Sequence, residues 1–185
     1  MKIVKFLIAL CIFNGAAGVA QVSAAAIDSS KSSVTVTFKQ EGVAVPASFK
    51  NISGTIDLDP ANPESGKAQI AVALTSFDLG EPEYNKEVQK KTWFDSAQFP
   101  QATFVSTGIK SLGAGKLAVQ GKLAIKGRTV DVSVPVVVKQ EGKAQIFEGQ
   151  LPIKRSSFNI GEGEWKDTDI LADEVVIKFK AVTMN

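Results

Sequence analysis

Residues Lys116 to Lys139 read KLAVQGKLAIKGRTVDVSVPVVVK, and apolar and polar residues alternate along them almost without exception. Alternation with a period of two is typical of a strand with one buried face. The apolar residues have odd numbers in the first half and even numbers in the second. A two-residue turn at Lys126-Gly127 explains this change, because it pairs Leu123 with Val130 on one face. The stretch therefore predicts a β-hairpin whose apolar face must be covered by another part of the protein.

The same register places Gly121 in the middle of the first arm, on the apolar face and opposite Val132. Two further apolar pairs follow from it: Val119 with Val134, and Leu117 with Val136. A glycine inside a strand costs stability and usually marks a bend or a close approach by another group. Together with Gly54 and Gly149, it indicates an interior with room for a ligand, which Gly121→Leu would then block. The alternative is that Gly121 lets the strand coil over an interior that is already packed, which leucine would overpack.

Six other segments alternate in the same way, and only one region of the chain has a helical composition. The six segments are 32–40, 49–58, 68–74, 101–109, 143–155 and 172–184. Between Phe77 and Pro100 the alternation stops, and Glu83 to Lys91 is predicted to be a short helix that begins near Pro82. With about eight strands and no βαβ pattern, the chain is predicted to be all-β. The alternatives are an antiparallel sandwich and a barrel, and an eight-stranded antiparallel barrel is favoured because it hides every apolar face and every strand edge.

Residues 1–26 are predicted to be a cleaved secretory signal peptide, and residues 27–185 a single domain. Lys2 and Lys5 precede the apolar run FLIALCIF, and the segment ends in QVSAAA. Cleavage can follow any of three alanines, at positions 24, 25 and 26. An uncleaved membrane anchor fits less well, because the apolar run is too short to span about 30 Å of hydrocarbon. We therefore expect an exported, periplasmic protein.

The composition excludes several kinds of chemistry. The chain contains no histidine, and its one cysteine, Cys11, lies in the predicted signal peptide. Catalysis by Ser-His-Asp or Cys-His groups and the usual zinc, copper and haem sites are therefore excluded. Removal of Lys2 and Lys5 leaves equal numbers of basic and acidic residues, which argues against nucleic-acid binding. A domain without disulfides must be held together by its hydrophobic core.

Two groups of mainly acidic residues have a composition that could suit a metal or catalytic site. Asp57, Asp59 and Asn62 have calcium-like spacing, but the loop lacks the central glycine and the final glutamate of an EF-hand. A second run, between Ser156 and Leu171, contains four carboxylates, and such a run is more often a solvated loop. No metal site is predicted. The carboxylates in the second group are Glu162, Glu164, Asp167 and Asp169.

Three segments resemble the YceI-like family, a group of exported, lipocalin-like proteins that bind polyisoprenoid lipids. They are FDSAQFPQATFVST at 94–107, GKLAVQGKLAIKGRTVDVSVPV at 115–136, and FEGQLPIKRSSFNIGEGEW followed by ADEVVIKFKA near the end. The resemblance implies a lipocalin-like, eight-stranded antiparallel barrel with one short helix near one end. It also implies a long apolar ligand, such as an isoprenoid quinone or its precursor. One segment departs from the pattern: many relatives carry an Asp and a His-Leu pair where this chain has NKEVQKKTWFD at 85–95. Contacts to a ligand head group are therefore not carried over.

The predicted function is to hold a polyisoprenoid for transport, storage or sequestration, with no cofactor and no catalytic residue. Trp93, Phe94 and Phe99 are expected either to plug one end of the barrel or to line an entrance to it. One alternative is an accessory module that delivers quinone to a membrane redox protein. Another is an enzyme that acts through Asp95 with Asp167 or Glu164, or through Tyr84. The predicted lining of the tunnel and its entrance consists of Phe38, Ile56, Val72, Phe77, Trp93, Phe94, Phe99, Phe104, Val119, Gly121, Leu123, Val132, Val134, Phe147, Phe158, Trp165, Ile177 and Phe179.

Overall fold

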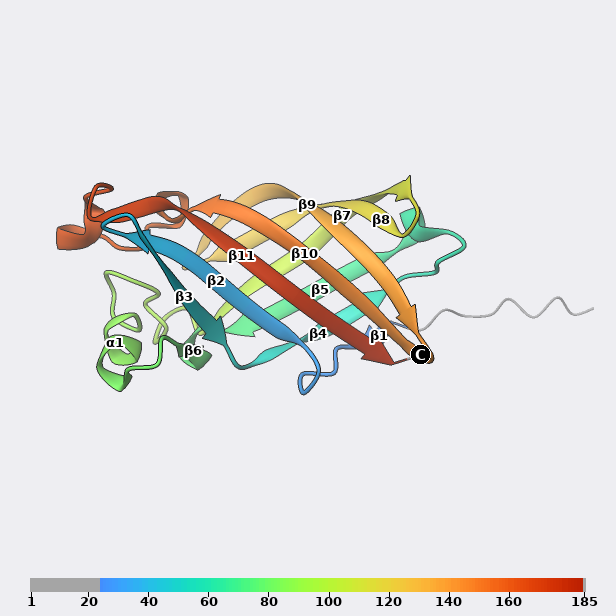
Figure 1. Ribbon diagram of the computed structural model, residues 1–185, viewed down its shortest axis with the longest axis horizontal. Coiled ribbons are helices and arrows are strands. Elements are labelled where there is room, and N and C mark those ends of the chain that lie inside the picture. The colour runs from blue at the N-terminus through green and yellow to red at the C-terminus, as the bar shows by residue number, and fades with distance from the viewer. Residues whose placement is uncertain (1–23, 185) are drawn as a thin grey trace, which may run out of the picture.

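The structure is a computed structural model that describes residues 24–184. These residues form one strongly curled antiparallel sheet of 11 strands and one short α-helix (Figure 1). The helix α1 and strand β6 lie at one end of the curled sheet, and the C-terminus lies at the other. The elements are β1 Ala25–Ala26, β2 Ser33–Gln40, β3 Val43–Phe49, β4 Ile52–Asp57, β5 Lys67–Ala73, β6 Phe77–Asp78, α1 Pro82–Glu87, β7 Gln101–Gly113, β8 Lys116–Ile125, β9 Arg128–Glu141, β10 Ala144–Lys154 and β11 Leu171–Met184.

The strand order closes the sheet on itself. The order is β1-β4-β5-β7-β8-β9-β10-β11-β2-β3-β6, so that β3 and β4 lie near opposite edges although only two residues separate them in the chain. At the C-terminal end of β11, β1 pairs with β4 and the next residue, Ile27, bridges to Thr183 of β11. The backbone of Asp28 also donates a hydrogen bond to the carbonyl oxygen of Val182 at 2.8 Å. This segment therefore connects β4, near one edge of the sheet, with the C-terminal end of β11.

The predicted hairpin forms with the predicted register. Leu123 pairs with Val130 and Gly121 with Val132 across β8 and β9. Lys126 and Gly127 form the two-residue turn with φ values of 49° and 71°, which match the positive φ angles of the turn type that fits strand twist. Leucine and valine side chains at the predicted inward positions are buried or half-buried, while their neighbours along the strands are mostly exposed.

The all-β antiparallel fold with one short helix is confirmed, but the number of strands is higher than the predicted eight. Two of the additional strands, β1 and β6, have only two residues each and carry no alternation signal. A third, β3, contains Pro46, which we expected to lie between strands. Pro46 pairs with Thr37 of β2 and has no ladder partner in β6, whose pairs with β3 involve only Ser48 and Phe49. Such a strand tolerates proline, because its free edge loses no hydrogen bond.

The helix and the chain start also differ in part from the prediction. Helix α1 begins at Pro82 as expected but ends at Glu87, and residues 88–99 continue in turns. Among residues 24–184, no helix is long and apolar enough to cross a membrane. Most of the predicted signal peptide lies outside the described residues, whereas Ala25 and Ala26, two of its last three residues, form β1. Cleavage after Ala24 would keep this strand in the domain.

The space above Gly121 is occupied by an aromatic ring and is not open to a ligand. A Cβ atom at this position would lie 2.4 Å from Cζ of Phe104 and 2.6 Å from the carbonyl oxygen of Val105. At Gly149, the ring of Phe179 takes the same position, 2.6 Å from the site of a Cβ atom. The lack of a side chain at these two glycines therefore leaves room for phenylalanine rings against the barrel wall. The interpretation of Gly121 as open tunnel wall is wrong.

Substitution of Gly121 by alanine should destabilise the protein by about 1–3 kcal/mol, because the new methyl group must displace the Phe104 ring or the backbone. Chemical denaturation measures this change in the free energy of unfolding. Gly108→Ala is the matched control in the neighbouring strand, since its Cβ would meet nothing closer than Gln120 Oε1 at 3.6 Å. Equal stabilities of the two variants would contradict the close contact between Gly121 and Phe104.

Candidate ligand-binding cavity

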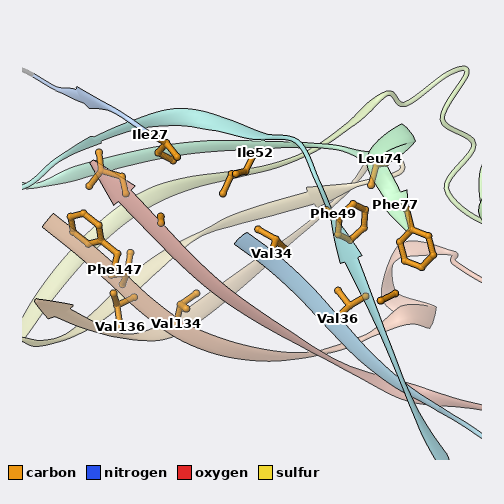
Figure 2. Packing of buried hydrophobic residues seen from close by; sticks show 14 of the residues in the cluster. Ile27, Val34, Val36, Phe49, Ile52, Leu74, Phe77, Val134, Val136 and Phe147 are labelled. Carbon is orange, nitrogen blue, oxygen red and sulfur yellow. The ribbon is translucent and has the colours of Figure 1, made fainter. Parts of the chain in front are cut away.

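The interior of the curled sheet holds a cavity of about 780 Å³. This volume lies within the range of roughly 300–1,000 Å³ that is usual for small-molecule sites. Every strand except β1 contributes lining residues, and nearly all of them are apolar. Figure 2 shows Val34, Val36, Val134 and Phe147 extending from different strands toward the same interior space. The inward faces predicted from alternation therefore enclose a single apolar chamber.

Most residues of the predicted lining lie on this cavity. Residues from the early strands and from the late strands meet there, although they are far apart in the sequence. Figure 2 places two of them, Phe77 and Phe147, in different parts of the same interior. The predicted residues that line the cavity are Phe38, Ile56, Val72, Phe77, Trp93, Phe94, Phe104, Val119, Leu123, Val134, Phe147, Trp165, Ile177 and Phe179.

Four predicted residues lie outside the lining. Gly121 is covered by Phe104, and Val132 packs among partly buried side chains of the same wall. Phe158 is only 1% exposed and belongs to a second buried cluster with Leu123 and Ile125. The ring of Phe99 lies against the hairpin turn, 2.8 Å from the position that a Cβ atom would take at Gly127. These aromatic and aliphatic groups support the wall of the cavity and do not face its interior.

The cavity opens at the end that carries α1. Only four of its lining residues are exposed, and together they form what we call the rim: Gln40, Pro46, Glu81 and Tyr84. Gln40 and Pro46 come from the β2–β3 hairpin. Glu81 directly precedes α1, and Tyr84 lies within it. Tyr84 is 59% exposed. At the opposite end the lining residues are buried or half-buried, so the opening lies between the β2–β3 hairpin and helix α1.

Aromatic side chains form a cluster beside the opening. The rings of Phe49, Phe77 and Phe94 lie with their centroids 5.3 to 6.0 Å apart, in edge-to-face or tilted arrangements. Trp93 and Trp165 form a separate pair at 5.5 Å. Within the described part of the chain, the indole Nε1 atoms of both tryptophans are buried and have no hydrogen-bond partner. Trp93 and Phe94 were expected either to plug one end of the barrel or to line an entrance to it. The two roles are compatible, because both residues pack against other side chains and line the cavity.

Arg155 holds together the loop that follows β10. It is 4% exposed and lines the cavity. Its guanidinium donates four hydrogen bonds of 2.7 to 3.2 Å, all to backbone carbonyl oxygens. Burial lowers the pKa of this guanidinium below its usual value, and the nearby Asp173 carboxylate offsets only part of this effect. Arg155 was not predicted as a site residue, although it continues the inward phase of Leu151 and Ile153. The accepting carbonyls belong to Ile160, Gly161, Leu171 and Ala172.

Asp78 anchors helix α1 beside the opening. Its Oδ1 accepts hydrogen bonds from the Gly80 backbone and from Asn85 Nδ2, both at 3.0 Å. Its Oδ2 forms an ion pair with Lys50 at 2.6 Å. The hydrogen bond from Lys50 is the largest cause that holds the pKa of Asp78 well below its usual range, followed by those from Asn85 and Gly80. Asn85 in turn accepts a hydrogen bond from the Leu79 backbone at 2.8 Å, which orients the first turn of the helix.

The carboxylates considered for catalysis or metal binding lie away from the cavity. Asp95, Glu164 and Asp167 are not among the lining residues, and Asp167 Oδ1 accepts a hydrogen bond from the Asp169 backbone at 2.9 Å. Asp59 Oδ1 accepts one from the Ala61 backbone at 2.8 Å, which stabilises the turn. In residues 24–184, no three acidic or sulfur-bearing side chains gather as a metal site would require. Tyr84 is the one catalytic alternative that does line the cavity.

Comparison with known proteins identifies the family and the fold. The family model of the YceI-like domain matches residues 26–183. Protein YceI of Salmonella arizonae is 32% identical over 118 residues, which cover 60% of this chain and 61% of that protein. The match thus spans about three-fifths of the curated relative. The same figures hold for Protein YceI of Salmonella newport.

Solved structures extend the likeness over more of the chain. Burkholderia cenocepacia BcnA is 50% identical, with a TM-score of 0.83 over 85% of this chain and 99% of BcnA. A polyisoprenoid binding domain from Saccharophagus degradans is 17% identical and has a TM-score of 0.71 over 88% of this chain and 99% of that domain. The second likeness concerns the fold alone. Both structures show that the curled sheet is a fold that known proteins share.

Substitution of Arg155 by lysine should lower the free energy of unfolding by at least about 2 kcal/mol, because a single amine cannot satisfy four carbonyls and an unpaired buried carbonyl costs about 1–3 kcal/mol. Thermal and chemical denaturation measure the effect. The adjacent, exposed Lys154 provides the reciprocal control, Lys154→Arg, which should change stability little. If Arg155→Lys were as stable as the unmodified protein, the guanidinium would not hold the loop.

Proposed function

The chain belongs to the YceI-like domain family, and from this we propose that it binds a long polyisoprenoid chain in its cavity and catalyses no reaction. The observation that carries the proposal is the apolar cavity of about 780 Å³ with a single exposed rim. An elongated, apolar chamber suits a flexible hydrocarbon chain better than a compact polar metabolite. The Saccharophagus degradans domain with the same fold, named for polyisoprenoid binding, supports this choice of ligand.

Burial of apolar surface provides the driving force for such binding. A chain that buries about 400 Å² gains on the order of 10 kcal/mol, at about 25 cal/mol per Å². The loss of translational and conformational freedom on binding offsets part of this gain. An exposed ion pair contributes only about 0–1 kcal/mol, so charges at the rim add little to the total affinity. We therefore attribute the affinity to the apolar interior.

An isoprenoid quinone or a quinone precursor is the ligand that we propose within this class. The predicted signal peptide supports a periplasmic location, where a water-insoluble lipid needs a carrier to leave a membrane. Transport, storage and sequestration all require the same reversible binding in a covered chamber. Delivery of quinone to a membrane redox protein stays a prediction from the sequence.

Binding of a prenyl quinone should depend little on salt, because apolar burial is not screened. Delipidated protein is titrated with the quinone, and the fluorescence of Trp93 and Trp165 reports binding, since both line the cavity. We expect the Kd to change less than about threefold between low salt and roughly tenfold higher salt. The same quinone ring without its prenyl chain is the control and should bind far more weakly. Weakening by tenfold or more with salt, or equal binding of the chainless ring, would refute the proposal.

A further inference from the structure

The rim of the cavity carries negative charge that no nearby base fully balances. Three charged residues line the cavity: Glu81, Glu87 and Arg155. The guanidinium of Arg155 is buried and directed to backbone carbonyls. Glu87 forms an ion pair with Lys90 at 2.5 Å. Glu81 is exposed, and no ion pair within 4.0 Å is found for it in residues 24–184. A ligand that protrudes from the cavity therefore meets carboxylates first.

We infer that this rim selects polyisoprenoids with an uncharged head group over phosphorylated ones, and that the unpaired carboxylate of Glu81 determines this specificity. The inference rests on the proposed function, since it concerns the head group of the same bound chain. The remaining polar groups of the rim are neutral: the hydroxyl of Tyr84 and the side-chain amide of Gln40. Both can donate and accept hydrogen bonds, so they suit a hydroxyl or carbonyl oxygen.

The position of the head group follows from the polarity of the cavity. A charged or strongly hydrated group loses much solvation free energy in an apolar chamber, so it stays at the opening while the chain enters. A phosphate carries about −1.5 to −2 charges near neutral pH. The unpaired carboxylate of Glu81, about 10 Å from such a group, disfavours it by about fourfold at low ionic strength, and salt reduces this effect. A neutral head group has no such penalty.

The lysines near the opening do not reverse the negative charge of the rim. Lys86 and Lys90 belong to α1 or the turn after it, and neither lines the cavity. Lys126 lies in the turn between β8 and β9, where its amine pairs with Glu162 at 2.9 Å. Its side chain is 8% exposed, and it also donates a hydrogen bond to the Asn159 carbonyl. These amines are either outside the opening or occupied by other partners.

The helix supplies a matched control for the test. Glu83 lies in the first turn of α1 and is exposed, but it does not line the cavity. Glu81 is at the N-cap position, yet its side chain makes no capping hydrogen bond. Glutamine at either position therefore removes one charge without removing a contact that the helix needs. The variant Glu81→Gln is therefore compared with Glu83→Gln.

The experiment measures the binding of geranylgeraniol and geranylgeranyl diphosphate, which share one chain, to the delipidated protein by tryptophan fluorescence. We expect the unmodified protein to prefer the alcohol, and the preference to shrink in high salt. In Glu81→Gln the affinity for the diphosphate should rise about fourfold at low ionic strength, while the affinity for the alcohol stays constant. Glu83→Gln should change the ratio of the two affinities much less.

Two negative results have different meanings. If the folded protein binds neither compound, the proposed function itself fails. If it binds the alcohol, but Glu81→Gln changes the ratio of the affinities no more than Glu83→Gln does, the function stands and the charge selectivity of the rim is refuted. Circular dichroism of each variant establishes that α1 and the barrel remain folded.

Discussion

The structure depends on one constraint: each long strand has a single apolar face, and no disulfide in the described part of the chain holds those faces together. Curling the antiparallel sheet until its edges meet covers every apolar face at once. The inward side chains are mostly valine, isoleucine and leucine, which are too short to meet at the axis of so wide a sheet. Phe104 and Phe179 pack over Gly121 and Gly149, where a Cβ atom would take their space. The cavity is thus a direct consequence of how the core is built.

The two ends of the barrel are closed by different means, and this difference gives the cavity its direction. At the C-terminal end of β11, residues 25–28 connect β4 with β11, and the buried side chains of Gln145 and Thr183 lie there. At the other end, α1 and the loop held by Arg155 cover the barrel incompletely and leave the rim between α1 and the β2–β3 hairpin (Figure 1). A chain can therefore enter from one side only, with its last polar atoms at the rim.

Alternation in the sequence was sufficient to predict the hairpin register and the inward faces, because both depend on local geometry with a period of two. It was not sufficient to distinguish a residue that faces the cavity from one that packs behind it. Val132 was placed on the cavity for this reason, and Gly121 was interpreted without knowledge of the Phe104 ring that covers it. The rim residues Glu81 and Tyr84 carry no periodic signal, since tertiary contacts such as those of Asp78 bring α1 to the opening.

Native mass spectrometry of the protein, purified without detergent or organic solvent from the cells that naturally produce it, tests the central claim most directly. We expect a complex of one chain with one lipid, whose added mass corresponds to a prenyl chain with an uncharged head group. Denaturation of the protein should release this lipid intact. Recovery of the bare polypeptide mass alone, from a sample whose fold is intact, would contradict the account.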